Sequence, residues 1–583
     1  MAAFPIRSVE PSVGLSSRVR HGLTMPESLE PRIAPATFIV ANLNDAGEGS
    51  LRDAVNRAND QDGADTIIFR KGLGGTIGIT SGQIQISDTL SIKGPGANKL
   101  VLDANSNSRI FLVSDLDPEK DSALTVSGLT FFRGFQNTPD GAGGAIFSIE
   151  SLKVGRCIFL DNQADGMLPN FIGGAIFLNN APDLSKVPLD VDIQDSSFLG
   201  NQNLARSGGA VTAQVGGTVR LINNIFSGNT AHDDGGAVFL QAGAGEVILL
   251  KHCQLLGNRA AQAGGALLEG IGFGDDGEGE IIVRGCRFEG NSSTNVEGGA
   301  LVISGGIGLI EKSSFAQNSA VGEGGALDAR FYSSLTIRSA QFLDNFSLVA
   351  DTIRGGGAMH LDMPGDSVTS IIASVIAGNR SNGGGGGILV DEGSGRLEII
   401  GSRIDNNDAS GSGGGILVLS DPANNHSANV SILRSKFTGN DATSNSEGGG
   451  GVCFFGDGTF TMRQSQMTDN TGFRLGGGLL LVNAEVATIT KSLFLNNTAF
   501  GAGGGIWADG SIDVNSTRIV GNVADVGGGL LGSKSIMLNS CIVSGNFAGG
   551  GGGIAHKVGI DPILNRTKVV RNISVDGLQI SDF

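Results

Sequence analysis

The chain has few cysteines and almost no tryptophan or tyrosine. Its 583 residues include five cysteines, one Trp and one Tyr. The cysteines form no Cys-x-x-Cys pair and are too sparse and odd in number for a disulfide framework, so we expect them to pack in a core. Clefts that process carbohydrates usually present aromatic side chains, and the scarcity of Trp and Tyr argues against such a cleft.

Clustered positive charge and long apolar runs are also missing. The formal net charge is −17, with 40 Lys and Arg against 57 Asp and Glu. A phosphate-binding surface needs clustered Lys and Arg, so nucleic acid is not an expected partner. No run of 18 apolar residues exists, which excludes a membrane-spanning helix on sequence grounds. Residues 1–36 have five prolines but no apolar signal core, so we see no standard signal peptide and expect a disordered or processed leader.

Glycine is the residue that the chain has in excess, with 95 copies. They follow no strict every-third-residue period, which excludes collagen. The hydrophobic fraction of 40% is too high for simple disorder. The glycines instead belong to an internal repeat.

From about residue 128 one pattern recurs: an apolar residue, two variable residues, Asn, a short turn, and Gly-Gly before an apolar strand. Phe226-Ser-Gly-Asn229, for example, leads to Gly235-Gly-Ala-Val-Phe239. The repeated asparagines are Asn162, Asn201, Asn229, Asn258, Asn291, Asn318, Asn345, Asn379, Asn407, Asn440, Asn470, Asn497, Asn522, Asn546 and Asn572. A repeat of about 29 residues is typical of a solenoid, and its core and surface positions alternate as in strands.

This pattern predicts an all-β parallel β-helix with about three short strands per coil. Residues 128–583 form about 15 coils, and residues 37–127 form an N-terminal cap with the first coils. The only expected helix covers about residues 50–61, opened by a capping box at Ser50 and Asp53. The apolar column before the asparagines should be one buried stack, which includes Phe226, Phe288, Phe315, Phe437 and Phe494. Asparagine tolerates left-handed backbone, so we assign it to a turn repeated in every coil.

The Phe-x-x-Asn and Gly-Gly-Ala-Ile repeat resembles the polymorphic outer-membrane protein repeat of bacterial surface proteins. Residues 38–113, with the run from Asn42 to Ala54 and Ile92-Lys-Gly-Pro-Gly-Ala97, are similar to the CSLREA-type module found before such repeats. These resemblances imply a right-handed β-helix, an extracellular or cell-surface location, and adhesion or structural roles. They imply no reaction.

Calcium is the one cofactor that the residues suggest. Asp234, Glu297 and Glu323 precede Gly-Gly pairs, and the last two lie on successive coils, where close carboxylates share a proton or bind a cation. A second candidate is the acidic insertion with Asp275, Asp276, Glu278 and Glu280, whose oxygen ligands suit calcium. A solvated acidic edge is the alternative for both sets.

Two function hypotheses remain open. The first is a non-enzymatic surface or extracellular protein whose rod presents variable loops to surface glycans or proteins. The second is a polysaccharide lyase or glycoside hydrolase on the same fold, which would need acids, a base and aromatics in one groove. The four long breaks of the repeat do not combine these groups, and the six histidines have no metal or triad spacing, so we expect no catalytic residues.

Overall fold

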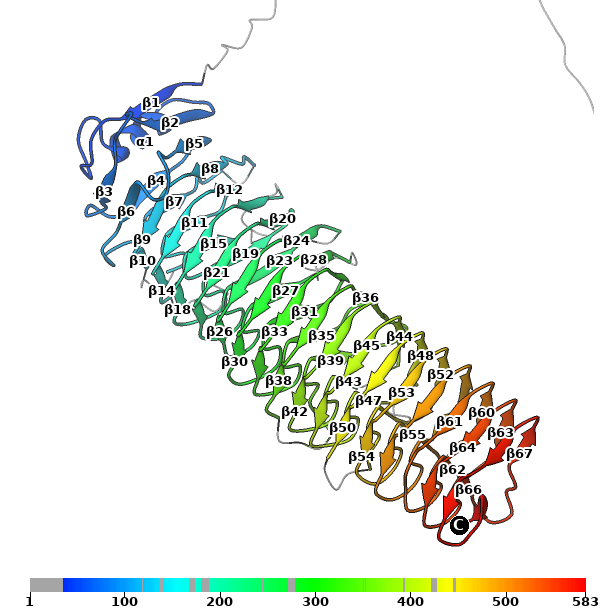
Figure 1. Cartoon of the computed structure of the whole chain (residues 1–583). Helices are drawn as coiled ribbons and strands as arrows, with labels where there is room; N and C mark the ends of the chain where they lie inside the picture. The colour runs from blue at the N-terminus through cyan, green and yellow to red at the C-terminus, as the bar shows by residue number, and fades with distance from the viewer. Residues whose placement is uncertain are drawn as a thin grey trace, which may run out of the picture.

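The computed structural model describes residues 35–583 except 118, 137–140, 167–172, 180–187, 244, 271–277, 350, 352, 392–393, 421–426 and 444–446. The chain winds into one straight rod of stacked coils, from the cap at one end to residue 583 at the other (Figure 1). The leader proposed for residues 1–36 lies almost wholly outside the described residues. Over the described ranges, no helix is long and apolar enough to cross a membrane.

The cap contains the single helix of the described residues, α1 (Leu51–Asn59), after strand β1 (Thr37–Val40). The Ser50 side chain accepts a hydrogen bond from the Asp53 amide at 3.1 Å, and the Asp53 carboxylate accepts one from the Gly49 amide at 3.0 Å. Ser50 and Asp53 therefore cap the helix as predicted, and its apolar face joins the core through Leu51 and Val55.

Each regular coil has three main strands and one short one. In a central coil they are β32 (Ile307–Glu311), β33 (Ser314–Ala316), the two-residue β34 (Ser319–Ala320) and β35 (Leu327–Arg330). Each pairs in parallel with its counterpart on the next coil, namely β36 (Ser334–Arg338), β37 (Gln341–Leu343), β38 (Phe346–Ser347) and β39 (Met359–Asp362).

The pairing builds three long parallel sheets along the rod. The first sheet contains β32 and has 19 strands, the second contains β33, and the third contains β35 and has 18 strands. The short strands form a separate 13-stranded sheet. The all-β parallel solenoid of about 18 coils is thus confirmed, with the short strand as an addition. The right-handed sense and the domain boundaries stay predictions.

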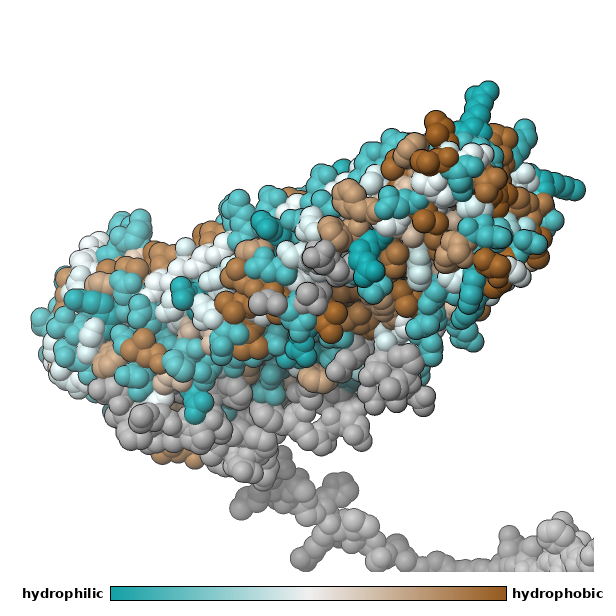
Figure 2. Space-filling model, turned by 90° about the horizontal axis from the view of Figure 1, so that it is seen from below, coloured by the Kyte–Doolittle hydropathy of each residue, from teal (hydrophilic) through white to brown (hydrophobic). Residues whose placement is uncertain are grey.

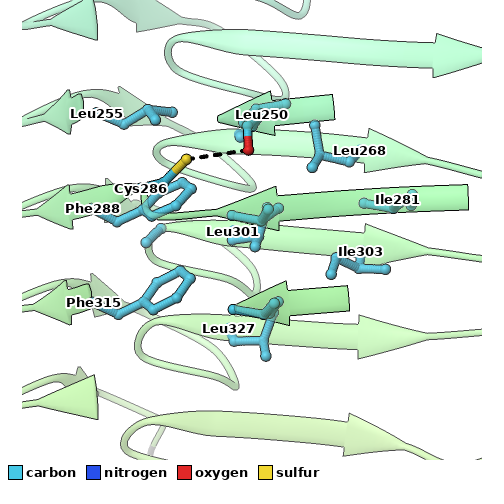
Figure 3. Close-up of a cluster of buried hydrophobic side chains, with 14 of the residues drawn as sticks. Leu250, Leu255, Leu268, Ile281, Cys286, Phe288, Leu301, Ile303, Phe315 and Leu327 are labelled. Atoms are coloured by element: carbon cyan, nitrogen blue, oxygen red, sulfur yellow. Dashed lines mark hydrogen bonds between the residues drawn. The ribbon is translucent and has the colours of Figure 1, made fainter. Parts of the chain in front are cut away.

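The predicted apolar column is buried in the core between the sheets. Phe226, Phe288, Phe315, Phe437 and Phe494 are all fully buried, which confirms the register. The ring centroids of Phe288 and Phe315 lie 4.6 Å apart with nearly parallel planes. Figure 3 shows these two rings on successive coils beside Leu301 and Leu327 of the third sheet.

The cysteines also pack in the interior, as predicted. All five are buried and free of disulfides. Cys286 ends the turn into the second sheet, and its thiol donates to the Leu250 carbonyl of the preceding coil at 3.4 Å (Figure 3). Burial raises the pKa of the Cys157 thiol to about 11, so this thiol stays protonated and unreactive at neutral pH.

The repeated asparagines form a buried ladder rather than the left-handed turn that we predicted. The Nδ2 group of Asn318 donates to Asn345 Oδ1 at 3.0 Å and to the Phe288 carbonyl at 3.1 Å. Its Oδ1 accepts from the backbone amide and the Nδ2 group of Asn291, both at 3.0 Å. The left-handed residue is the one before each asparagine, such as Gln317 with φ +55°. The sequence prediction was therefore wrong by one position.

Replacing Asn318 with alanine should lower the free energy of unfolding by about 2–3 kcal/mol, because it leaves buried hydrogen-bonding groups of Asn291 and Phe288 without partners. Thermal unfolding of the full chain and hydrogen exchange of β29 (Arg287–Glu289) to β37 measure the loss. The exposed Asn295, changed to alanine, is the matched control and should have little effect. Equal stability of the two variants would contradict the ladder.

Length variation is confined to two of the four turns in a coil. From β8 (Leu124–Ser127) onward, two residues separate each first-sheet strand from the next second-sheet strand, and two residues also separate the second-sheet strands from the short strands. The turns that flank the third sheet differ widely. Only two residues separate β31 (Leu301–Ser304) from β32, whereas ten residues separate β27 (Ala266–Glu269) from β28 (Glu280–Arg284).

Candidate functional site

The third sheet has a second buried layer on the face opposite the core. Leu301 and Ile303 of β31 belong to the main core, whereas Val302 between them belongs to a separate apolar cluster with Phe239 and Leu267. The turn before the strand lies against this layer, since a Cβ on Gly298 would come within 2.3 Å of Val302 Cγ2. Glycine is required there, because its φ of +66° also disfavours other residues.

Residues in register with Val302 form one line along the rod, and we call the part of this line from Phe239 to Trp507 the outer column. Its members are Phe239, Leu267, Val302, Asp328, His360, Leu389, Leu417, Cys453, Leu480 and Trp507. Those from Leu389 to Leu480 form a further buried apolar cluster. Asp328 of β35 and His360 of β39 are the two members that carry a charge, and they interrupt the apolar layers.

Asp328 and His360 are bonded to each other and to an arginine. His360 Nδ1 lies 2.6 Å from Asp328 Oδ1, and the other Asp328 oxygen accepts from Arg330 at the end of the same strand. Arg330 also donates to Glu297 Oε2 at 3.0 Å. The buried aspartate is thus held between an imidazole on one side and a guanidinium on the other.

Two more carboxylates complete what we call the polar cluster: Glu297, Glu323, Asp328, Arg330, His360 and Asp391. Glu323 Oε2 lies 3.7 Å from His360 Nδ1, and Glu323 Oε1 lies 3.7 Å from Arg354 Nη1. Asp391 ends β43 (Ile388–Asp391), the strand after β39. All members of the polar cluster except the fully buried Asp328 line a hollow of about 160 Å³, together with Arg354, Asp362 and Phe331, which is 62% exposed.

Asp328 and His360 stabilise each other's charged forms. Burial would raise the pKa of Asp328, but the hydrogen bond and charge of His360, with the charge of Arg330, lower it below its usual value. Burial would likewise lower the pKa of His360, yet Asp328, Glu323 and Asp391 raise it to about 9. At neutral pH the two residues are therefore an ion pair.

Two other acids near the outer column hold their protons more strongly than usual. Burial raises the pKa of Glu323 despite the opposing charges of His360 and Arg354. Burial, and then the charge of Asp234, raises the pKa of Glu269 to about 7. These two carboxyl groups therefore take up a proton at a higher pH than exposed glutamates do.

Some polar atoms of the polar cluster have no hydrogen-bond partner among the described residues. They include His360 Nε2 and Glu323 Oε1, both shielded from solvent. One ring nitrogen of His360 and one carboxylate oxygen each of Glu323 and Asp391 lie within 4.8 Å of one another. Three ligand atoms at this spacing could surround one metal ion.

The sequence-predicted column Asp234, Glu297 and Glu323 is linked through other side chains. Glu297 and Glu323 lie on successive coils, with the Gly298 amide bonded to the Glu323 carbonyl at 3.0 Å. Asp234 accepts from Ser207 at 2.9 Å and, with the Gln262 amide in its favoured orientation, from Gln262 at 3.1 Å. The Gln262 oxygen then accepts from Arg330, which joins Asp234 to the polar cluster.

The two described acids of the acidic insertion, Glu278 and Glu280, form no hydrogen bond or ion pair with this group. Glu278 accepts from Ser333 Oγ at 2.7 Å, and the exposed Glu280 opens β28. Asp275 and Asp276 lie outside the described residues. Calcium binding by either acidic set stays a prediction.

Sequence reasoning missed Asp328, Arg330, His360 and Asp391. We read all six histidines as structural, because their spacing shows no metal or triad pattern. The hydrogen-bond partner of His360, Asp328, lies 32 residues away along the chain. A signal was present in the strand after Gly-Gly, where Asp328 and His360 occupy a position that is apolar in most other copies.

Residues 225–241 match the family model of the Chlamydia polymorphic membrane protein repeat. They run from the second sheet to the third in one coil, which confirms the repeat resemblance. The CSLREA-type resemblance stays a prediction. No curated protein matches the chain.

Two solved structures are similar to the chain, both at low sequence identity and low TM-score. Tailspike protein 3 of bacteriophage CBA120 is 11% identical at a TM-score of 0.24, over 90% of this chain and 59% of the tailspike chain. The PL6 family alginate lyase AlyGC is 11% identical at a TM-score of 0.21, over 94% of this chain and 100% of the lyase. Similarity this weak decides nothing about the function of this chain.

Proposed function

We propose that this chain, a parallel β-solenoid carrying a polymorphic membrane protein repeat, is a non-enzymatic protein of the bacterial surface or extracellular space that binds partners along one face of its rod. The repeat match favours a surface location. The net charge of −17 makes nucleic acid an unsuitable partner, which leaves surface glycans or proteins.

The observation that carries this proposal is the confinement of length variation to the two turns beside the third sheet. A rod with only a structural role does not need turns of variable length on one side. A binding protein does, because variable loops on a rigid scaffold change specificity without disturbing the core. The surface seen in Figure 2 mixes hydrophilic and hydrophobic residues, which suits contacts with a partner that is itself hydrated.

The test is binding of the full chain to a glycan array and to cultured cells. A loop-shortened variant lacks residues 180–187, 271–277 and 421–426, which lie in three of the long turns beside the third sheet. We expect it to lose at least tenfold in affinity. A control with Lys153, Asp192 and Arg220 of the first sheet changed to serine should keep the wild-type affinity. Equal losses in both variants would contradict a binding face at the third sheet.

The polar cluster favours a second candidate, a polysaccharide lyase or hydrolase. It combines carboxylates with Arg354, His360 and the exposed Phe331 at one hollow, which is the combination that the long breaks of the sequence lack. Incubation with acidic polysaccharides decides between the two. Sugar release or an unsaturated uronate product that disappears in Glu323→Gln or Glu297→Gln would replace the non-enzymatic proposal with this one.

A further inference from the structure

We propose that Glu323, His360 and Asp391 bind a divalent transition-metal ion at the hollow on the third sheet, with Asp328 holding the histidine ring in place. This inference does not depend on the proposed surface function. The three ligands come from three successive coils: the turn before β35, strand β39 and the end of strand β43.

The arrangement of His360 is the one that metal-binding histidines usually have. One ring nitrogen, Nδ1, lies 2.6 Å from the Asp328 carboxylate, and this contact fixes the ring. A metal ion at the other nitrogen, Nε2, would displace the proton that makes His360 a cation at neutral pH. That other nitrogen, Nε2, is buried and has no hydrogen-bond partner in the described part of the chain. His360 as a whole is only 8% exposed, so water does not readily supply the missing partner.

Glu323 gives a second, independent indication. Its residue is 6% exposed, and its Oε1 atom is buried without a hydrogen bond from any described residue. Leaving buried polar atoms unpaired is costly, and native proteins rarely do so without a ligand or a functional reason. Arg354 is 3.7 Å away, but its side chain is 59% exposed and can move aside when a cation enters.

The ligand set selects the class of metal. A calcium ion prefers six to eight oxygen ligands, whereas imidazole nitrogen suits zinc and other transition metals. One histidine and two carboxylates make three protein ligands, which leaves a coordination position open to the hollow. Zinc is therefore the probe of choice, and calcium is the comparison.

His556, Asp561 and Asp582 form another group with ligand atoms within 4.8 Å, near the last strand, β70 (Ile580–Asp582). Both of its carboxylates are on exposed residues, and His556 Nδ1 lies 3.2 Å from Asp582 Oδ1. It has no buried atom without a partner among the described residues. This group supplies the matched control.

The experiment is calorimetric titration of zinc chloride into the full chain, purified without a histidine tag and stripped of metal. Cobalt chloride serves as a spectroscopic probe, because its visible absorption reports nitrogen and oxygen ligands. We expect one zinc ion to bind per chain at the polar cluster. Asp391→Asn and Glu323→Gln should each weaken binding at least tenfold. His556→Gln should bind like the wild type, and circular dichroism confirms that each variant is folded.

Three results would overturn the proposal. The folded full chain could take up no zinc, zinc could bind equally well to Asp391→Asn and Glu323→Gln, or calcium could bind to the same residues more tightly than zinc. The last result would instead favour the calcium prediction made for Glu323 from the sequence.

Discussion

Replacing His360 with leucine should lower the free energy of unfolding of the surrounding coils by about 3–5 kcal/mol. The change removes the cation that neutralises Asp328, a carboxylate that is fully buried. Arg330 remains, but it also pairs with Glu297, so it compensates the buried charge only in part. Hydrogen exchange of β35, β39 and β43 measures the loss locally, and thermal unfolding of the full chain measures it overall.

The double variant, with Asp328 and His360 both changed to leucine, should recover most of this loss. Val302 and Leu389 flank the pair in the outer column, so two leucines would continue the apolar layer on either side. Well-packed apolar residues often match or exceed the stability of a buried ion pair. The exposed His232, changed to leucine, is the control and should be neutral. A double variant as unstable as the single one would mean that the ion pair itself stabilises the fold.

Replacing Phe315 with alanine should cost about 3–5 kcal/mol, as large-to-small changes in packed cores do. Its ring is stacked between Phe288 and Phe342, with centroids 4.6 Å away on both sides, and it is fully buried. Removal of the ring leaves a cavity that neighbouring coils cannot fill, because the turns before and after the second sheet have a fixed length. Hydrogen exchange of β29, β33 and β37 measures the local loss.

Two comparisons test whether packing is the cause. Phe315→Leu should cost less, since Leu255 occupies the same register position on an earlier coil. Phe331→Ala should have little effect on stability, because this phenylalanine is mostly exposed. If Phe315→Ala unfolds no more easily than Phe331→Ala, the stack does not stabilise the rod.

The fold could be predicted because every copy of the repeat has the same order of buried and exposed positions. The apolar column that contains Phe315 recurs in every copy, so its burial followed from alternation alone. The role of Asn318 could not be found in this way. A single coil shows an asparagine in a turn, and only the stacking of coils brings its amide against Asn291 and Asn345.

The candidate site was predictable only in part, for a related reason. Glu297 and Glu323 stand out as acids at one position of the repeat, and both belong to the polar cluster. Asp328 and His360 carry a weaker signal, since strand alternation places them on the face opposite the core, and only the structure shows that the turn before the strand covers this face. The strength of their interaction depends on that burial, which sequence periodicity does not reveal.

The unvarying turns set a constant pitch for the whole molecule. Successive coils are about 4.8 Å apart. The long turns after β15 (Ile176–Asn179) and β27 are three coils apart, or about 14 Å, and the one after β47 (Ile416–Leu419) lies five coils further, or about 24 Å. The span of about 38 Å between the outer two exceeds the diameter of a small domain, about 30 Å. An elongated polymer lying parallel to the axis could touch all three, whereas a small compact partner would reach only neighbouring ones.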